Sequence, residues 1–417
     1  MKKTTDKSDR VKHQRMQKWW HNRVLQVVLG VAVIMLLGGG AYHIYTKPCS
    51  YEACFYSTSN GNEKSTVEAL AAEEFQSHAA ALSAVETYPT RIPQHQMPLT
   101  LPRDFAFHDD MAQERWHYVA NVEDRSGHRY GIHWTFMRVE QEKAHLDHPQ
   151  RRASTGWQNS HLYIVQTVIT SQHQVWREQR FARGGIGQAG LIKQPFTLWI
   201  DNWSWRASDE QPFPGTLTVD TDQFSFSLFH RSPVTWRFLG DNGYQILHDR
   251  VPLTSFGIVA PSFPVSGTLT LDGQAPFTVQ GRAWLDKAWS NNLLEADRLG
   301  WDWFMIPLAN GATLSVNRYR DRYQMPQISA QLFKADGSQI RFDRRQMTVR
   351  ALWPLDSVDG RSLPLRWQIV IPSEHIDLTT HVLNRHDWHT FASSYWQGPI
   401  EVRGSDKGQG FMRLSDY

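Results

Sequence analysis

From about residue 93 onward, hydrophobic and polar side chains alternate in short runs. Ile132, Trp134 and Phe136 would share one face of an extended chain, because successive side chains of a strand point to opposite faces. The same alternation recurs in Phe224–Leu228 and in Leu365–Ile371. A period of two at this density, without helix-length periodicity, predicts an antiparallel all-β fold.

Turn signals divide this region into many short strands, and Asp272-Gly273 is a typical hairpin pair. About 320 residues of short strands are too many for one small barrel, so the pattern predicts two β-barrels or sandwiches. We place these domains at residues 93–260 and 261–417. The run Gly215–Asp220 recurs almost unchanged as Gly267–Asp272, which is compatible with two similar halves.

The first 92 residues have a different pattern. Val24–Tyr45 is apolar apart from Gln26 and His43, and as a helix it would span about 33 Å, enough for a bilayer core. We expect an uncleaved transmembrane anchor here, with a cleaved secretory signal as the alternative. Residues 46–92 are expected to be a stalk, with a helix over Thr66–Thr87.

The charge distribution predicts how this anchor is oriented. Residues 1–25, which include the basic tail 1–23, hold eight Lys or Arg and two Asp, so at a total charge of +3 the rest is slightly acidic. Basic residues stay in the cytoplasm, which predicts a single-pass bacterial inner-membrane protein with a periplasmic main body. Its acidic body lacks the basic surface that nucleic acids require. Cys49 and Cys54 would form a periplasmic disulfide or remain free thiols.

A search for standard chemical motifs finds little. Gly185–Gly190 matches GxGxxG, but a strand-like run follows it, so it lacks the helix N-terminus that holds a pyrophosphate. His145/His148 and His386/His389 have spacings that a metal could use on a helix. Both pairs lie among polar residues, and we expect them in solvated loops. Neither a cofactor nor a metal is expected.

Aromatic and acidic residues cluster instead in three short blocks. Trp284 and Asp286 would point to one face of a strand, as would Trp301 and Trp303. A carboxyl group among indole rings has a raised pKa and can stay protonated near neutral pH, so Asp286 is the candidate general acid. The alternative is that the tryptophans fill a barrel and Asp286 caps a turn. The candidate ligand-binding residues are Trp284, Trp289, Trp301, Trp303, Trp116, Tyr118 and Trp134.

The motifs between Tyr88 and Tyr417 resemble the AttH-like, carotenoid 1,2-hydratase-related family of two-domain lipocalin-like proteins. The matching segments are Glu114–Tyr118, Gly127–Arg138, Ser266–Gly273, Val279–Gly311 and Tyr395–Tyr417. This resemblance implies two consecutive lipocalin-like antiparallel β-barrels, here behind the anchor and stalk.

Several polar positions depart from the family pattern. Ala288 and Gln397 replace glutamates, Gln166 replaces a histidine, and Arg413 lies where the final block has a different polar pattern. Asp286 is retained in the "WlD" motif. In the hydratase branch the matching aspartate supplies a proton to an alkene, so the resemblance implies the same role for Asp286.

Two function classes follow, with a third behind them. The first is a periplasmic module that binds a hydrophobic, lipid-like or isoprenoid-like ligand, and for it the resemblance implies an ABC-type permease as partner. The second is a hydratase or isomerase acting on an isoprenoid or polyene double bond, with Asp286 as acid and indole rings stabilising a carbocation. The third, a secreted hydrolase, lacks a candidate nucleophile.

Overall fold

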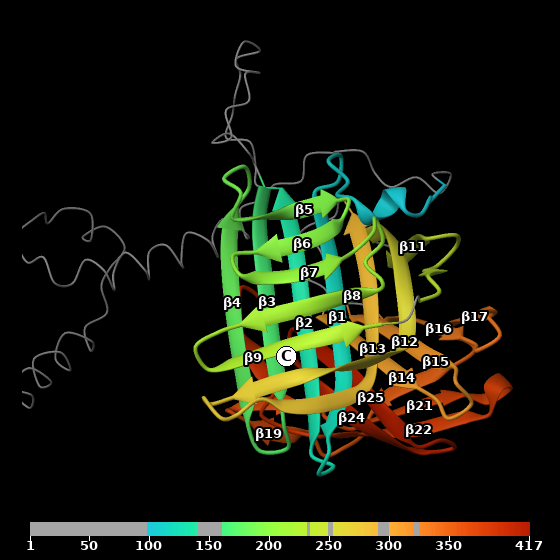
Figure 1. The fold of residues 1–417 in the computed structure, drawn as a ribbon. Helices are drawn as coiled ribbons and strands as arrows, with labels where there is room; N and C mark the ends of the chain where they lie inside the picture. The colour runs from blue at the N-terminus through green and yellow to red at the C-terminus, as the bar shows by residue number, and fades with distance from the viewer. Residues whose placement is uncertain (1–97, 141–160, 232–233, 249–252, 291–299, 321–324) are drawn as a thin grey trace, which may run out of the picture. The chain divides into compact units, whose positions relative to one another are not determined.

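The computed structural model describes residues 98–140, 161–231, 234–248, 253–290, 300–320 and 325–417. These residues belong to one compact unit and form strands almost throughout (Figure 1). Short 3-10 helices occur at η1 (Arg103–Phe105) and η3 (Pro372–Glu374). The all-β prediction is therefore confirmed.

Several sequence-based expectations lie outside the described residues. They are the basic tail 1–23, the anchor Val24–Tyr45, the stalk 46–92 with Cys49 and Cys54, and the pair His145/His148. Along the described ranges, no helix has the length and hydropathy of a membrane span.

The first antiparallel sheet is built from the N-terminal part of the described chain. In sheet order its strands are β4 (Val175–Arg183), β3 (His161–Thr170), β2 (Arg129–Glu140), β1 (Gln113–Asp124), β13 (Phe277–Ser290), β12 (Leu253–Leu271), β9 (Phe224–His230), β8 (Gly215–Asp220), β7 (Trp203–Ala207), β6 (Phe196–Ile200) and β5 (Ala189–Lys193). Two further strands, β10 (Arg237–Phe238) and β11 (Tyr244–His248), pair with β12.

The second antiparallel sheet holds most of the remaining chain. In sheet order its strands are β17 (Gln339–Asp343), β16 (Gln327–Phe333), β15 (Thr313–Arg320), β14 (Gly300–Pro307), β25 (Gly408–Ser415), β24 (Ser394–Gly404), β22 (Ile376–Val382), β21 (Trp367–Ile371) and β18 (Thr348–Ala351), and β23 (Trp388–Thr390) pairs with β24. A separate hairpin joins β19 (Asp356–Val358) to β20 (Arg361–Leu363).

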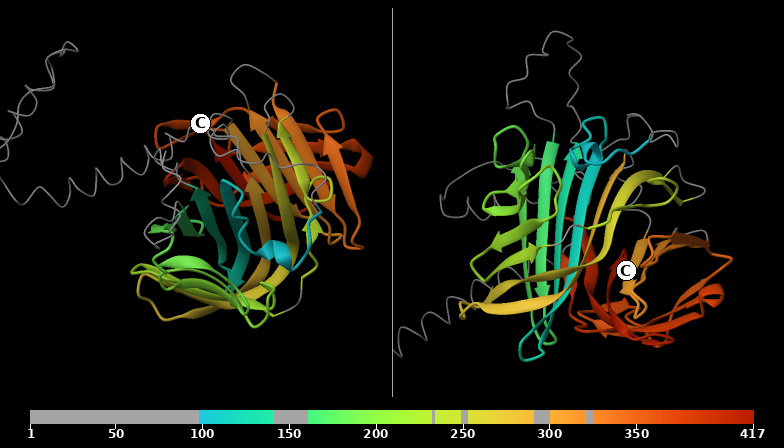
Figure 2. Two further views of the ribbon diagram at one scale, coloured as in Figure 1. Left: turned by 90° about the horizontal axis from the view of Figure 1, so that it is seen from above. Right: turned by 45° about the vertical axis from the view of Figure 1, so that its right-hand side comes forward.

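Each large sheet curls around its own hydrophobic core. In the first sheet, β5 to β9 fold back across β2 to β4 (Figure 1). The two sheets together are a nearly closed barrel and a half-barrel (Figure 2). A third, smaller apolar cluster joins the sheets, and its members are Val119, Val259, Trp284, Trp303, Met305, Phe333 and Phe411.

The three strands read from alternation are confirmed as β2, β9 and β21. The predicted turn also forms, because Asp272 (φ 50°) and Gly273 (φ 69°) both adopt the left-handed conformation between β12 and β13. Positive φ at both central residues is typical of a type I′ turn, and the Gln274 N–H closes this turn by donating to the Leu271 oxygen over 2.9 Å.

The boundary between the sheets lies later in the chain than the expected 260/261. β12 continues through that point, with a shift in its register against β13 between Ala260 and Phe263, and β13 also belongs to the first sheet, which ends at Ser290. The repeated six-residue runs likewise lie in one sheet. Gly215–Asp220 is β8 and Gly267–Asp272 overlaps the end of β12, and both flank β9. The two runs are therefore the neighbours of β9 on either side within one sheet, and the repeat does not mark two similar domains.

The central strands β1 and β13 separate two environments. Even-numbered residues of β1, such as Trp116 and Tyr118, enter the core of the first sheet, as do odd-numbered residues of β13 such as Leu285. Val119 and Trp284 point the other way, into the apolar cluster between the sheets. The pleat of these two strands thus decides which side chains can meet the second sheet.

Candidate functional site

Asp286 lies at the centre of the candidate site, where β1 and β13 pair. His117 and Asp286 are direct partners in that antiparallel ladder, so their side chains lie on the same face. His117 Nδ1 lies 3.1 Å from Asp286 Oδ2, and the Trp284 indole N–H donates to the same oxygen over 2.9 Å. Arg115 Nη2 donates to Asp286 Oδ1 over 3.2 Å. The carboxylate thus accepts from three side chains.

These contacts reverse the expected charge state of Asp286. Burial alone would raise its pKa, but Arg115 and the hydrogen bonds from His117 and Trp284 lower the pKa to about 2. The expectation of a raised pKa was wrong, because donors and a cation surround the carboxylate together with the indole rings. Asp286 is therefore ionised at neutral pH.

A second layer of polar groups from the other sheet supports His117. Gln397 on β24 and Arg413 on β25 are strand partners, so they reach the interface side by side. Gln397 Nε2 lies 3.0 Å from His117 Nε2, and Arg413 Nη1 donates to Gln397 Oε1 over 3.3 Å. Burial lowers the pKa of His117, although Asp286 opposes this, so the imidazole is neutral.

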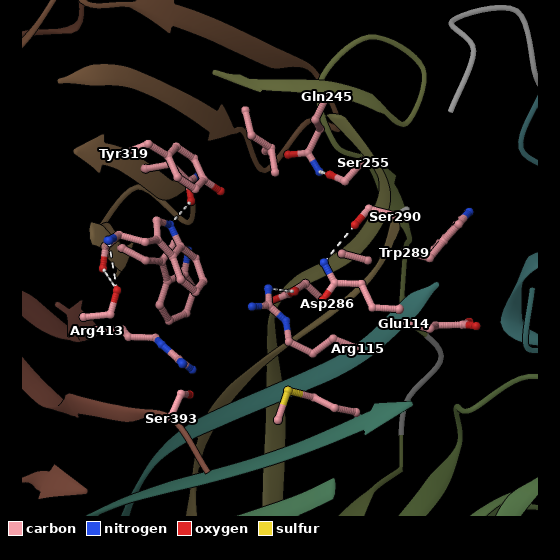
Figure 3. Close-up of a pocket in the computed structure, with 18 of the residues that line it drawn as sticks. Glu114, Arg115, Gln245, Ser255, Asp286, Trp289, Ser290, Tyr319, Ser393 and Arg413 are labelled. Atoms are coloured by element: carbon pink, nitrogen blue, oxygen red, sulfur yellow. Dashed lines mark hydrogen bonds and ion pairs between the residues drawn. The ribbon is translucent and has the colours of Figure 1, made fainter. Parts of the chain in front are cut away.

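A cavity of about 530 Å³ opens between the two sheets beside Asp286, and we call it the inter-sheet cleft. Its aromatic wall consists of Trp284, Trp289, Trp301, Trp303 and Tyr319. Figure 3 shows Arg115 and Asp286 on one side of the opening, with Tyr319 and Arg413 opposite them. A concave surface with an aromatic wall and a few convergent polar groups is typical of a small-molecule site.

Two guanidinium groups flank one tryptophan in this cleft. The guanidinium carbons of Arg115 and Arg413 lie 5.1 and 5.3 Å from the centre of the Trp301 ring. Six charged side chains line the cleft, and the acids Asp286, Glu114 and Asp416 balance Arg115, Arg138 and Arg413 in number. Near Trp301, where the two guanidinium groups lie, the cleft suits a flat, apolar molecule that carries or develops negative charge on an oxygen.

The structure separates the predicted ligand-binding residues into two sets. Trp284, Trp289, Trp301 and Trp303 line the inter-sheet cleft together with Asp286. Trp289 also belongs to the core of the first sheet and stacks on His108 at 4.1 Å, so it lies at the border of the two environments. The other three predicted residues, Trp116, Tyr118 and Trp134, belong to the core of the first sheet and do not line the cleft. This corrects their assignment. All three occupy positions whose side chains the pleat directs into the barrel.

Removing Arg115 tests the cause of the low Asp286 pKa. In Arg115→Met the pKa of Asp286 should rise from about 2, because burial then acts against fewer stabilising contacts. A carbon-13 NMR titration of the aspartate carboxyl would measure it. Arg180→Met is the matched control, since Arg180 also stacks on a buried indole, that of Trp203 at 4.0 Å, but does not contact Asp286. An unchanged Asp286 titration in Arg115→Met would contradict this account.

A buried cluster of charges at the end of the first barrel escaped the sequence analysis. Lys287 Nζ lies 2.5 Å from Glu114 Oε1 and donates to the main-chain oxygens of Asp104 (2.7 Å) and Ala106 (2.6 Å). Lys287 and Glu114 side chains are both fully buried. The lysine thus uses all three protons, and it fastens the segment around η1 to β13. Local sequence could not show this pairing, because it depends on the β1–β13 register.

His389 also differs from its expectation of a solvated loop. It lies in β23, fully buried, with Nε2 3.0 Å from the main-chain oxygen of Gln397, and burial lowers its pKa to about 3. His386 is exposed as expected. Across the ranges that the structure describes, no group of three His, Cys, Asp or Glu is arranged to hold a metal.

His230 provides a test of how buried histidines affect stability. It lies in the core of the first sheet, with Nε2 3.1 Å from the Tyr118 hydroxyl and Nδ1 3.2 Å from the Gly215 oxygen. Burial lowers its pKa from 6.5 to about 3, although the Gly215 carbonyl acts in the opposite direction.

The free energy of unfolding should fall as the pH drops from 6.5 towards 3. Folded His230 stays neutral there while the unfolded chain binds a proton, which costs about 1.4 kcal/mol per pH unit for one such histidine. His230→Phe should make the slope of the unfolding free energy against pH shallower by about that amount. Urea unfolding at several pH values measures the slope, and an unaltered slope would show that His230 is not held neutral.

Comparisons with known proteins are consistent with this architecture. The family model described as AttH-like matches residues 92–417. The structure is similar to that of a candidate AttH protein of Nitrosomonas europaea, at 21% identity and a TM-score of 0.66, covering 78% of this chain and 99% of that one. It is also similar to kievitone hydratase of Nectria haematococca, at 12% identity and a TM-score of 0.57, covering 79% and 96%. A search of curated protein sequences finds no match. These structural likenesses show a shared fold.

Proposed function

Because the chain belongs to the AttH-like family, we propose that its inter-sheet cleft is the active site of a hydratase-type enzyme acting on a largely apolar molecule. The observation that carries this proposal is one ionised carboxylate, Asp286, held by His117, Trp284 and Arg115 in the wall of an aromatic cleft. The name of one protein with the same fold, kievitone hydratase, supports water addition as the reaction class.

The charge state of Asp286 favours one kind of double bond. An isolated alkene needs a protonated acid at the start, and Asp286 begins without a proton. A double bond conjugated to a carbonyl needs a base to activate water and a cation to stabilise the enolate. Asp286 supplies the base, and Arg115 and Arg413 supply positive charge in the cleft. We therefore place an activated alkene here instead of a polyene.

The proposed steps balance in protons and electrons. Asp286 takes a proton from water while the water oxygen bonds to the β-carbon, and the double-bond electrons move onto the carbonyl oxygen as an enolate. The Arg115 and Arg413 guanidinium groups stabilise that oxygen electrostatically. Protonated Asp286 then returns its proton to the α-carbon, which restores both the carbonyl and the carboxylate. The reverse sequence removes water from a β-hydroxy ketone.

Isotopic labelling tests this proposal directly. Full-length protein is incubated with benzylideneacetone and homologues with longer alkyl chains in water enriched in oxygen-18 or deuterium. We expect a product that gains one labelled hydroxyl at the β-carbon and one deuterium at the α-carbon, detected by mass spectrometry. The absence of labelled product from every member of the series would overturn the assignment of an activated alkene.

A ligand-binding module is the second candidate, and the aromatic wall of the cleft is the observation that favours it. Such a module would bind the same apolar ketones without labelling them. Fluorescence quenching of the cleft tryptophans measures binding separately from turnover. Saturable quenching with no labelled product would favour binding over chemistry.

The cleft offers less to a hydrolase. Six serines line it, and the hydroxyls of three of them, Ser255, Ser290 and Ser315, accept from Gln245, Gln113 and the Trp303 indole. A nucleophilic serine needs a neighbouring base. These three hydroxyls contact side-chain amides and an indole, none of which is a base.

A further inference from the structure

The Gln397 side chain links His117 to Arg413. We infer that Gln397 is a positioning residue that holds the proton of His117 on Nδ1, and thereby commits Asp286 to begin as a base. The consequence for catalysis rests on the proposed function, whereas the hydrogen bonds that determine the His117 tautomer do not depend on it. Gln397 and His117 are both fully buried, so water does not compete for these contacts.

Arg413 determines which way the Gln397 amide points. A guanidinium group only donates hydrogen bonds, so the amide end 3.3 Å from Arg413 Nη1 must be the oxygen. The amide nitrogen then faces His117 and donates to Nε2 over 3.0 Å. A neutral imidazole with Nε2 as acceptor carries its proton on Nδ1, where it is donated to Asp286.

The groups around the amide are themselves held by neighbours. The Arg413 guanidinium stacks on the Tyr395 ring at 3.8 Å, and the Tyr395 hydroxyl donates to Gln166 Oε1 over 2.8 Å. Both polar groups of the Gln397 main chain have partners. Its N–H donates to the main-chain oxygen of Asp387 over 3.1 Å, and its carbonyl oxygen lies 3.0 Å from His389 Nε2. The guanidinium that orients the amide and the main chain that carries it are therefore both held in place.

This arrangement disfavours a charged imidazole. A proton on His117 Nε2 would face the N–H of Gln397, and two donors cannot share one hydrogen bond. The other groups around the ring add to this effect, because Arg115 and Arg413 are cations and His133 lies buried beside it. A glutamate at position 397 would accept that proton, so an imidazolium would lie between two carboxylates.

Nitrogen-15 NMR of the full-length protein tests the inference without any substrate. We expect the wild-type His117 ring at neutral pH to show a protonated Nδ1 and an unprotonated Nε2. In Gln397→Glu the signal of the unprotonated nitrogen should be lost, because both nitrogens then carry protons. Gln166→Glu is the matched control, since Gln166 is equally buried in the same interface but bonds to Tyr395 and Gln179. Its His117 spectrum should equal that of the wild type.

Three results would overturn the inference. The first is a wild-type His117 protonated on Nε2, which needs no variant and so does not depend on any variant folding. The second is a Gln397→Glu protein whose His117 keeps one unprotonated nitrogen. The third is a Gln166→Glu protein whose His117 loses the signal of the unprotonated nitrogen. The tautomer can be as inferred while no ketone is hydrated, so failure of the proposed function is distinguishable from failure of this assignment.

Discussion

Asp286→Asn should abolish most of the proposed hydration while leaving binding of the ketone nearly intact. General acid or base catalysis typically contributes ~10²–10⁴-fold, and asparagine can neither take the proton from water nor return it. The amide keeps the shape of the side chain and can still accept from the Trp284 indole, which lies 2.9 Å from the native carboxylate. Labelled-product formation measures the rate, and quenching of the cleft tryptophans measures binding.

Asp343→Asn is the matched control, because Asp343 is an exposed carboxylate on β17 that does not line the cleft. Its rate should equal that of the wild type. An Asp286→Asn protein with undiminished turnover would eliminate the catalytic role that we assign to Asp286. If Asp286 only shaped the cleft, the substitution would change ketone binding and there would be no turnover to lose.

Lys287→Met should destabilise the folded protein by about 3–5 kcal/mol, the usual cost of removing one partner from a buried ion pair. The substitution removes the nearest cation of the buried Glu114 carboxylate, which keeps Arg138 at 3.4 Å and His108 at 3.2 Å, and it leaves the main-chain oxygens of Asp104 and Ala106 without their donor. Urea unfolding at neutral pH measures the loss. The segment around η1 should also become more accessible to proteases, because Lys287 is what fastens it to β13.

Lys334→Met provides the comparison for this result. Lys334 lies 3.3 Å from Glu374, but both side chains are partly exposed, and such pairs contribute about 0–1 kcal/mol. The double variant Glu114→Gln/Lys287→Met should recover part of the loss, since it also removes the buried carboxylate that has lost its nearest cation. A Lys287→Met protein no less stable than Lys334→Met would show that the buried pair is not holding the barrel end.

Local alternation was sufficient to predict the fold class and which side chains share a face. Trp284 and Asp286 were placed on one face, as were Trp301 and Trp303, and all four line the same cleft. The period of two is a property of each strand alone, so it can be read without knowing its neighbours. For the same reason it could not tell whether Trp116, Tyr118 and Trp134 faced a barrel core or a cleft.

The sequence by itself thus determined an all-β chain with an acid among tryptophans. Only the tertiary structure decided the charge on that acid, because His117 and Arg115 reach Asp286 from strand positions 169 and 171 residues away. Gln397 contacts His117 across 280 residues and from the other sheet. A pKa depends on charges and donors within a few ångströms, wherever they lie along the chain. The strand register and the contact between the two sheets bring those groups together here. The local alternation of side chains predicts neither of them.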